Sequence, residues 1–198
     1  RICTVPFDEL VKNNVIVTPR IHIQKSNVSA DEVGSISAAK KAIVETVKHY
    51  EKNFFNVENH KILFCCDGTK TIQGLINEGL PQWAKNRGYK VLSIDSVNNG
   101  YCDGDRNIGK RQFLELLRDL GSDPSQKLIV LHHSMLSEGV DVPGMSGVVF
   151  LRNSVDMIFA VQAIGRVLRT DKNNPQKNYG VVTIVQHDDQ IEQVEEMV

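Results

Sequence analysis

Short, almost wholly apolar runs alternate along this chain with segments whose apolar residues recur every three or four positions. We expect strands at residues 15–23, 61–66, 90–94, 127–131, 147–151 and 179–185. Nearly all-apolar strands are typical of a parallel sheet that is covered on both faces. Helical segments between them supply the crossovers that parallel strands require. The alternation therefore predicts an α/β fold, with an open, mostly parallel sheet and helices on both faces.

The segments between these runs predict helices. From residue 36 to residue 50 the apolar residues follow helical spacing, and Ser29–Glu32 upstream has the spacing of a capping box. Helices are also expected from about residue 69, at 108–120 and at 155–169. Pro19 marks the first strand as an edge or a bend, and the polar stretch 98–107 is predicted to be a loop.

Composition excludes several classes of protein. Hydrophobic residues make up 41% and charged residues 24% of the 198 residues, which is ordinary for a globular chain. The formal net charge of −1 argues against a protein that coats nucleic acid, so any such contact must come from a local patch. No stretch approaches the roughly 20 apolar residues that cross a bilayer, and no membrane contact is expected. Because the first residue is Arg1, we expect a piece of a longer chain.

The cysteines and acidic residues do not form a recognisable metal site. Four cysteines without a CxxC pair argue against a disulfide scaffold and against zinc held by thiolates, and favour a reduced, cytoplasmic protein. Asp103, Asp105 and Asn107 resemble the start of a calcium loop, but Ile108 stands where glycine is required. The sequence therefore predicts no metal site in this chain.

Two segments carry residues suited to binding a nucleotide. Residues 137–143 follow a predicted strand and should lie at the carboxyl edge of the sheet, where Gly139 allows close approach and Asp141 suits a ribose hydroxyl or a cation. Arg166 and Arg169 are three positions apart on a predicted helix and share a face. Two guanidinium groups match the oxygens of a polyphosphate. Each feature alone also fits an ordinary turn or a solvated helix face.

The order and spacing of these segments resemble a known family. Ser-Glu-Gly-Val-Asp-Val-Pro at 137–143, a hydrophobic strand, and Gln-Ala-Ile-Gly-Arg-Val-Leu-Arg at 162–169 are similar to motifs V and VI of superfamily 2 helicases and translocases. The nearest branch contains restriction-enzyme motor subunits and related DEAD/DEAH-type proteins. Residues 61–66 resemble the motif IV strand, and residues 7–19 resemble the segment that leads out of the first motor domain. The resemblance implies a lead-in at residues 1–25 and a second RecA-like domain at residues 26–198.

The resemblance also implies roles for single residues. Arg169 would be the arginine finger and Arg166 a second contact to the γ-phosphate, while Gln162, Gly139 and Asp141 would complete the ATP-facing set. The positions that would face the nucleic-acid backbone are Cys66, Asp67, Gly68, His133 and Ser134. His133-Ser134 departs from the Thr-Asp or Val-Asp common in relatives, so a buried, hydrogen-bonded histidine is an equal alternative there.

The implied cofactors are ATP and Mg²⁺, with the magnesium ligands in a preceding first domain. Gly104–Arg111 follows the phosphate-binding pattern until its last position, where Arg111 cannot coordinate magnesium. The implied partners are a single strand of DNA or RNA, the N-terminal RecA-like domain of the same chain, and nuclease or restriction subunits. We therefore expect half of an ATP-hydrolysing helicase or translocase, inactive by itself. The alternative is a non-catalytic α/β module that binds a nucleotide or a partner and has lost motor activity.

Overall fold

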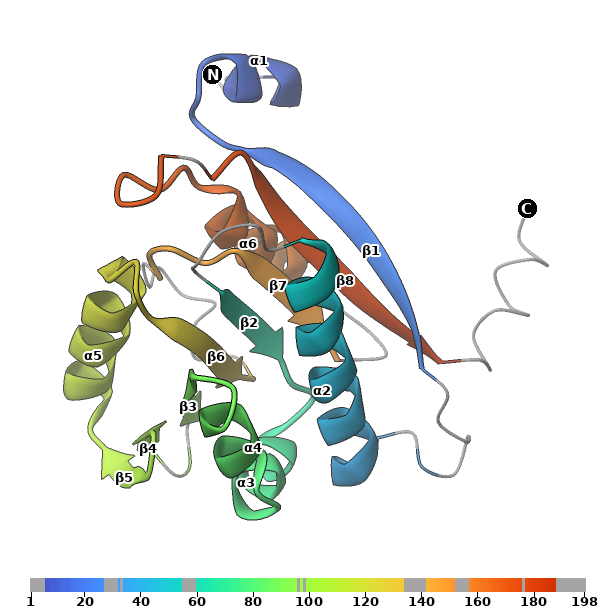
Figure 1. Cartoon of the computed structure of the whole chain (residues 1–198), viewed down its shortest axis with the longest axis vertical. Helices are drawn as coiled ribbons and strands as arrows, with labels where there is room; N and C mark the ends of the chain where they lie inside the picture. The colour runs from blue at the N-terminus through green and yellow to red at the C-terminus, as the bar shows by residue number, and fades with distance from the viewer. Residues whose placement is uncertain are drawn as a thin grey trace.

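The computed structural model describes residues 6–26, 32, 34–54, 60–95, 97, 99–133, 142–151, 157–175 and 177–187. One sheet of eight strands runs through them in the order β1-β8-β7-β2-β6-β3-β4-β5 (Figure 1). The strands are β1 (Thr18–Ser26), β2 (Lys61–Cys65), β3 (Tyr89–Asp95), β4 (Asn99–Cys102), β5 (Asp105–Ile108), β6 (Lys127–His132), β7 (Gly147–Phe150) and β8 (Tyr179–His187). The first six in the sheet order pair in parallel, and β4 and β5 are antiparallel. The predicted α/β fold is confirmed.

Helices cover both faces of this sheet, as predicted. They are α1 (Phe7–Lys12), α2 (Ile36–Asn53), α3 (Thr69–Asn77), α4 (Leu80–Lys85), α5 (Lys110–Ser122) and α6 (Met157–Leu168). Neighbouring residues of a strand point to opposite faces. On β2, Ile62 and Phe64 pack with the apolar residues of α2, α3 and α4, while Leu63 and Cys65 pack with those of α5 and α6. Every residue of β2 is buried, which explains why Ile62–Cys65 is an unbroken apolar run.

Two local predictions are wrong. The polar stretch 98–107 is not a loop over its described part, because β4 and β5 form an antiparallel hairpin there at the sheet edge. Asn99, Asp103 and Asn107 have positive φ angles, a conformation that Asn and Asp tolerate better than most residues. The predicted capping box does not start α2, and its residues 29–31 lie outside the described part of the chain. That helix begins at Ile36, and the Ser35 hydroxyl accepts a hydrogen bond from the Ala38 N–H at 3.1 Å.

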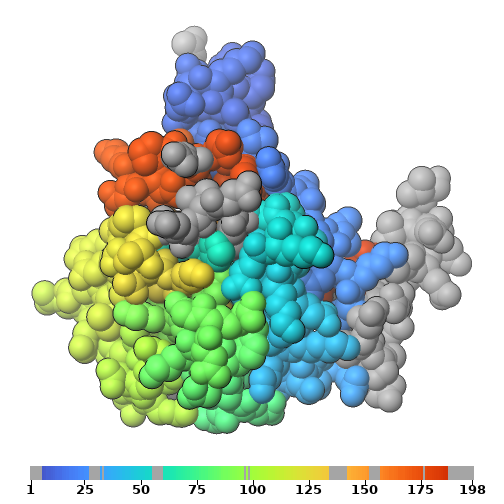
Figure 2. Space-filling view, in the orientation of Figure 1, coloured from blue at the N-terminus to red at the C-terminus, as the bar shows by residue number. Residues whose placement is uncertain are grey.

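The other edge strand, β1, lies where Pro19 predicted an edge. It pairs with β8 over its whole length, so the sheet includes residues 18–25, which the resemblance assigned to a lead-in. The division at residue 25 itself stays a prediction. Helix α1 buries none of its residues and projects from the body of the molecule (Figure 2). In the part of the chain that the structure describes, no helix has the length and apolar character to span a membrane.

Candidate functional site

A cleft of about 370 Å³ lies at the amino edge of the sheet, where the parallel strands begin. One wall comes from Val142, Pro143 and Gly144, and the other from Arg166 and Arg169 near the end of α6. Thr170, Asp171, Lys172, Asn173 and Lys177 complete the lining. The structure thus brings the end of the 137–143 segment together with both candidate arginines. Gly139 and Asp141 lie outside the described residues.

The position of this cleft corrects one prediction, since Val142 and Pro143 do not lie at the carboxyl edge. A Cβ atom on Gly121, at the end of α5, would lie 2.7 Å from the Pro143 carbonyl oxygen, and the Ser146 N–H donates to the Lys61 carbonyl at 2.8 Å. Lys61 is the first residue of β2. Because β7 runs parallel to its neighbour β2, the chain must return to the amino edge before β7 begins.

The two candidate arginines differ in exposure. Arg166 is only 6% exposed, whereas Arg169, the first residue after α6, is exposed. The backbone there is fixed by the segment before β1, because the Val17 N–H donates to the Leu168 carbonyl at 2.7 Å and Ile16 forms an antiparallel bridge with Arg169. Gln162 is also exposed on α6 but does not line the cleft.

A lysine that the sequence did not single out completes the cleft. Burial, opposed by the Asp171 carboxylate and aided by the charge of Lys61, lowers the pKa of Lys177 to about 8. Burial also lowers the pKa of Lys61, against the charges of Asp171 and Asp123. Lys177 lies in the polar stretch between α6 and β8, and no sequence motif there indicated a functional lysine. Cations that surround one cleft can bind the oxygens of a polyphosphate.

The nucleic-acid candidates lie at the opposite, carboxyl edge. Cys66, Asp67 and Gly68 follow β2, and His133 follows β6, with its Nδ1 atom 3.2 Å from the Cys66 carbonyl oxygen. Ser134 lies outside the described residues. The Cys66 side chain is buried in the core beneath α2 and α3, so only its backbone can face a ligand.

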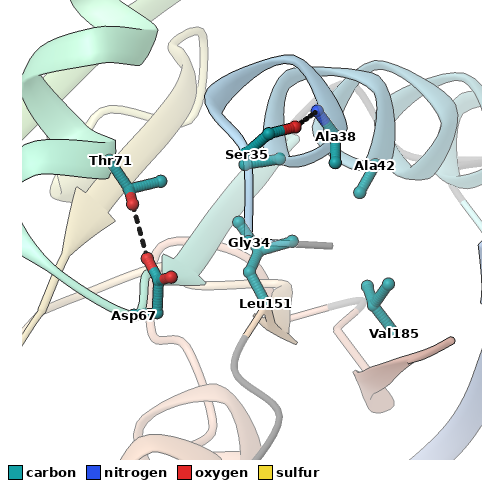
Figure 3. Close-up of a pocket in the computed structure, with 9 residues that line it drawn as sticks. Gly34, Ser35, Ala38, Ala42, Asp67, Thr71, Leu151 and Val185 are labelled. Atoms are coloured by element: carbon teal, nitrogen blue, oxygen red, sulfur yellow. Dashed lines mark hydrogen bonds between the residues drawn. The ribbon is translucent and has the colours of Figure 1, made fainter. Parts of the chain in front are cut away.

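Asp67 and Gly68 immediately precede α3. Asp67 Oδ1 accepts a hydrogen bond from the Thr71 hydroxyl at 2.6 Å, beside a small pocket that Ser35, Ala38 and Leu151 help to line (Figure 3). Gly68 is the N-cap of α3 and has no side chain to satisfy the first N–H groups of that helix. Helix N-termini of this kind can donate N–H groups to phosphate oxygens.

The tract Gly104–Arg111 does not have the geometry of a phosphate-binding loop. Its centre is strand β5, which pairs with β4, and Gly109 is the N-cap of α5. A phosphate-binding loop instead joins a strand directly to a helix. Among the described residues, no group of three or more His, Cys, Asp or Glu side chains is arranged to hold a metal ion.

Residues 41–171, more than half of the chain, match the family described as Helicase conserved C-terminal domain. No curated protein matches the chain. Among solved structures, it is similar to a fragment of an HsdR subunit of a type I restriction enzyme from Vibrio vulnificus YJ016, with 19% identity and a TM-score of 0.59 over 89% of this chain and 33% of that chain. The type ISP restriction-modification enzyme LlaBIII bound to DNA gives 15% identity and a TM-score of 0.58 over 91% and 13%. Domain 2 of the DEAD-box helicase Mss116p bound to an RNA duplex gives 15% and 0.56 over 91% and 59%.

The chain thus spans at most 59% of the length of each of these three structures. At such low identities the structural likeness shows the fold, which is the RecA-like α/β fold that the motif resemblance implied. The family match is independent of that likeness and covers α3 to α6 completely, together with most of α2. The chain belongs to the family of helicase conserved C-terminal domains.

Proposed function

We propose that this chain is the second motor domain of an ATP-dependent nucleic-acid helicase or translocase. The observation that carries the proposal is the cleft at the amino edge, where Arg166 and Arg169 face Val142–Gly144. In the proposed protein a first domain binds the nucleotide phosphates and this cleft closes over them. Closure on ATP and opening after hydrolysis would supply the movement.

The proposed chemistry is transfer of the γ-phosphoryl group of ATP to water. Such a reaction needs positioning and charge stabilisation more than covalent chemistry. Arg169, exposed at the end of α6, would stabilise the charge that develops on the transferred group, and the buried Arg166 would hold the ground-state phosphate. Gln162, Gly139 and Asp141 are proposed ATP contacts from the motif resemblance. The proposed Mg²⁺ ligands belong to the preceding domain.

The carboxyl edge would form half of a groove for one strand of DNA or RNA. The proposed contacts are Cys66, Asp67 and Gly68 after β2, and His133 and Ser134 after β6. The likeness to LlaBIII bound to DNA and to Mss116p domain 2 bound to an RNA duplex supports this proposal. The likeness to two restriction-enzyme chains supports nuclease or restriction subunits as further partners.

The test is Arg169→Ala in the full-length protein. Its kcat for ATP hydrolysis should fall by roughly 10³–10⁵, which is about 4–7 kcal/mol of activation free energy. ATP affinity should change far less, because the finger acts on charge that develops in the transition state. Arg169→Lys should recover little, since an ammonium cannot reproduce the guanidinium fork. The measurements are kcat and the ATP dissociation constant.

The control is Arg118→Ala, which removes an arginine from the exposed face of α5 and should leave kcat and ATP affinity unchanged. Thermal melting of all variants checks that they fold. If Arg169→Ala keeps the wild-type kcat, the arginine-finger role is wrong and the non-catalytic nucleotide-binding module becomes the better interpretation.

A further inference from the structure

Arg169 follows the C-terminal end of α6, and helix ends are usually the least rigid part of a helix. Helix α6 ends at Leu168, and the last four carbonyls of a helix have no partner within the helix. Ends of this kind fray. A side chain that must meet a phosphate within a fraction of an ångström therefore needs its backbone held from outside the helix.

The bridge to Ile16 is one such hold, and Lys177 supplies a second. Its ammonium donates to the Arg169 carbonyl oxygen at 2.8 Å and to the Met145 carbonyl oxygen at 2.7 Å. Met145 is fully buried in the core between the sheet and the helices α5 and α6, so it is a rigid anchor. One ammonium thus ties the residue after α6 to the segment that forms the opposite wall of the cleft.

The positive charges around Lys177 disfavour another ammonium, but the carbonyl oxygens beside it favour one. Arg166, Arg169 and Lys172 line the same cleft and Lys61 adds to the positive charge, while Asp171 is the opposing carboxylate. Two of the three ammonium hydrogens go to main-chain carbonyls. A cation at a helix C-terminus also interacts favourably with the helix dipole.

We propose that Lys177 is a positioning residue, which fixes the backbone of Arg169 against Met145 and so directs the Arg169 guanidinium into the cleft. This inference rests on the proposed function of Arg169. It assigns Lys177 no contact with ATP. Loss of Lys177 should therefore affect the rate of hydrolysis through Arg169 and leave nucleotide affinity nearly unchanged.

The test is a double-mutant cycle in the full-length protein. Lys177→Met should lower kcat by about 10-fold to 100-fold, the range that a small misplacement of a catalytic group can cost. The ATP dissociation constant should stay within about twofold, and Lys177→Arg, which keeps the donors, should recover most of the rate. The double variant Arg169→Ala/Lys177→Met should be no slower than Arg169→Ala, because both changes remove the same interaction. Lys85→Met, on the exposed surface of α4, is the control.

The outcomes separate the two proposals. If Arg169→Ala keeps the wild-type kcat, the proposed function fails. If Arg169→Ala is slow while Lys177→Met is as fast as wild type, only the role of Lys177 is overturned. A rise in the ATP dissociation constant without loss of kcat would instead make Lys177 a phosphate contact, and additive losses in the double variant would show action independent of Arg169. Should Lys177→Met fail to fold, Lys177→Gln takes its place in the cycle with the same non-additivity expected.

Discussion

At the scale of single residues, two stacked histidines make the stability of this domain depend on pH. His22 of β1 and His49 of α2 lie with their ring centroids 4.1 Å apart and their planes 9° apart. Burial lowers the pKa of His22 below its ordinary value, and the neighbouring charge of His49 lowers it further. The unfolded chain therefore binds a proton at His22 more readily than the folded chain does. Stability from this group is present above the unfolded pKa and is lost as pH falls from about 6.5 toward the lowered value.

We therefore expect His22→Gln to weaken the acid sensitivity of the fold. The wild-type melting temperature should drop between pH 7.5 and pH 5.5, and the drop should be smaller in the variant. Thermal melts at both pH values, at constant ionic strength, measure this. Equal drops in the two proteins would show that other groups cause the acid sensitivity.

At the scale of elements, the contact between the end of α6 and the start of β8 depends on a glycine. A Cβ atom on Gly180 would lie 2.7 Å from the Val167 carbonyl oxygen and 2.8 Å from the Val167 Cγ1 atom. Gly180 is buried, and its φ angle is not in the left-handed region, so only space requires glycine there. This close approach lies two residues before Arg169, which lines the cleft.

Gly180→Ala should lower the free energy of unfolding by about 1–3 kcal/mol, the usual cost of overpacking. Gly165→Ala, in helix α6, is the matched comparison. Apart from its two chain neighbours and the backbone of its own helix, no atom lies within 4 Å of its added methyl group, and the position is exposed. That change should stabilise the domain by roughly 0.5–1 kcal/mol through helix propensity. Urea unfolding of both variants measures the difference. A neutral Gly180→Ala would mean that α6 moves away freely.

At the scale of the whole molecule, the domain carries the two arginines proposed to bind a phosphate, Arg166 and Arg169, but no phosphate-binding loop that its sequence or described structure identifies. Strand β5 occupies the centre of the tract Gly104–Arg111, which mimics such a loop in sequence. Catalysis of phosphoryl transfer requires magnesium and a phosphate cradle as well as arginines. The proposed function therefore assigns the phosphate cradle and the magnesium ligands to another domain.

We expect the 198-residue chain alone to hydrolyse no ATP above background. The measurement is phosphate release at saturating ATP and Mg²⁺, with and without single-stranded DNA or RNA. Turnover that Lys110→Ala abolishes would assign catalysis to the tract Gly104–Arg111 and contradict this prediction. Turnover that survives Lys110→Ala would indicate a contaminating enzyme.

The sequence by itself determined the strands of the parallel sheet and the family. An apolar run such as Ile62–Cys65 arises because both faces of β2 are buried. Burial in the tertiary structure can therefore be predicted from the local composition of such a strand. The segments 137–143 and 162–169 and the hydrophobic strand between them resembled the family that the match over residues 41–171 confirms, because sequence motifs of this kind are local patterns. The hairpin β4–β5 escaped prediction for the opposite reason. An edge hairpin exposed to water can carry polar residues, and these are also typical of loops.

The tertiary structure alone decided where the candidate residues meet. Sequence order suggested that residues 137–143 share the carboxyl edge with Cys66–Gly68, yet Val142 and Pro143 lie at the amino edge beside Arg166. The reason is the parallel pairing of β7 with β2, a contact between distant segments that obliges the chain to cross back before β7 begins. Lys177 meets Met145 through another such pairing, because β8, which follows Lys177, lies beside β7, which follows Met145. No local pattern encodes a contact that exists only because β8 returns beside β7.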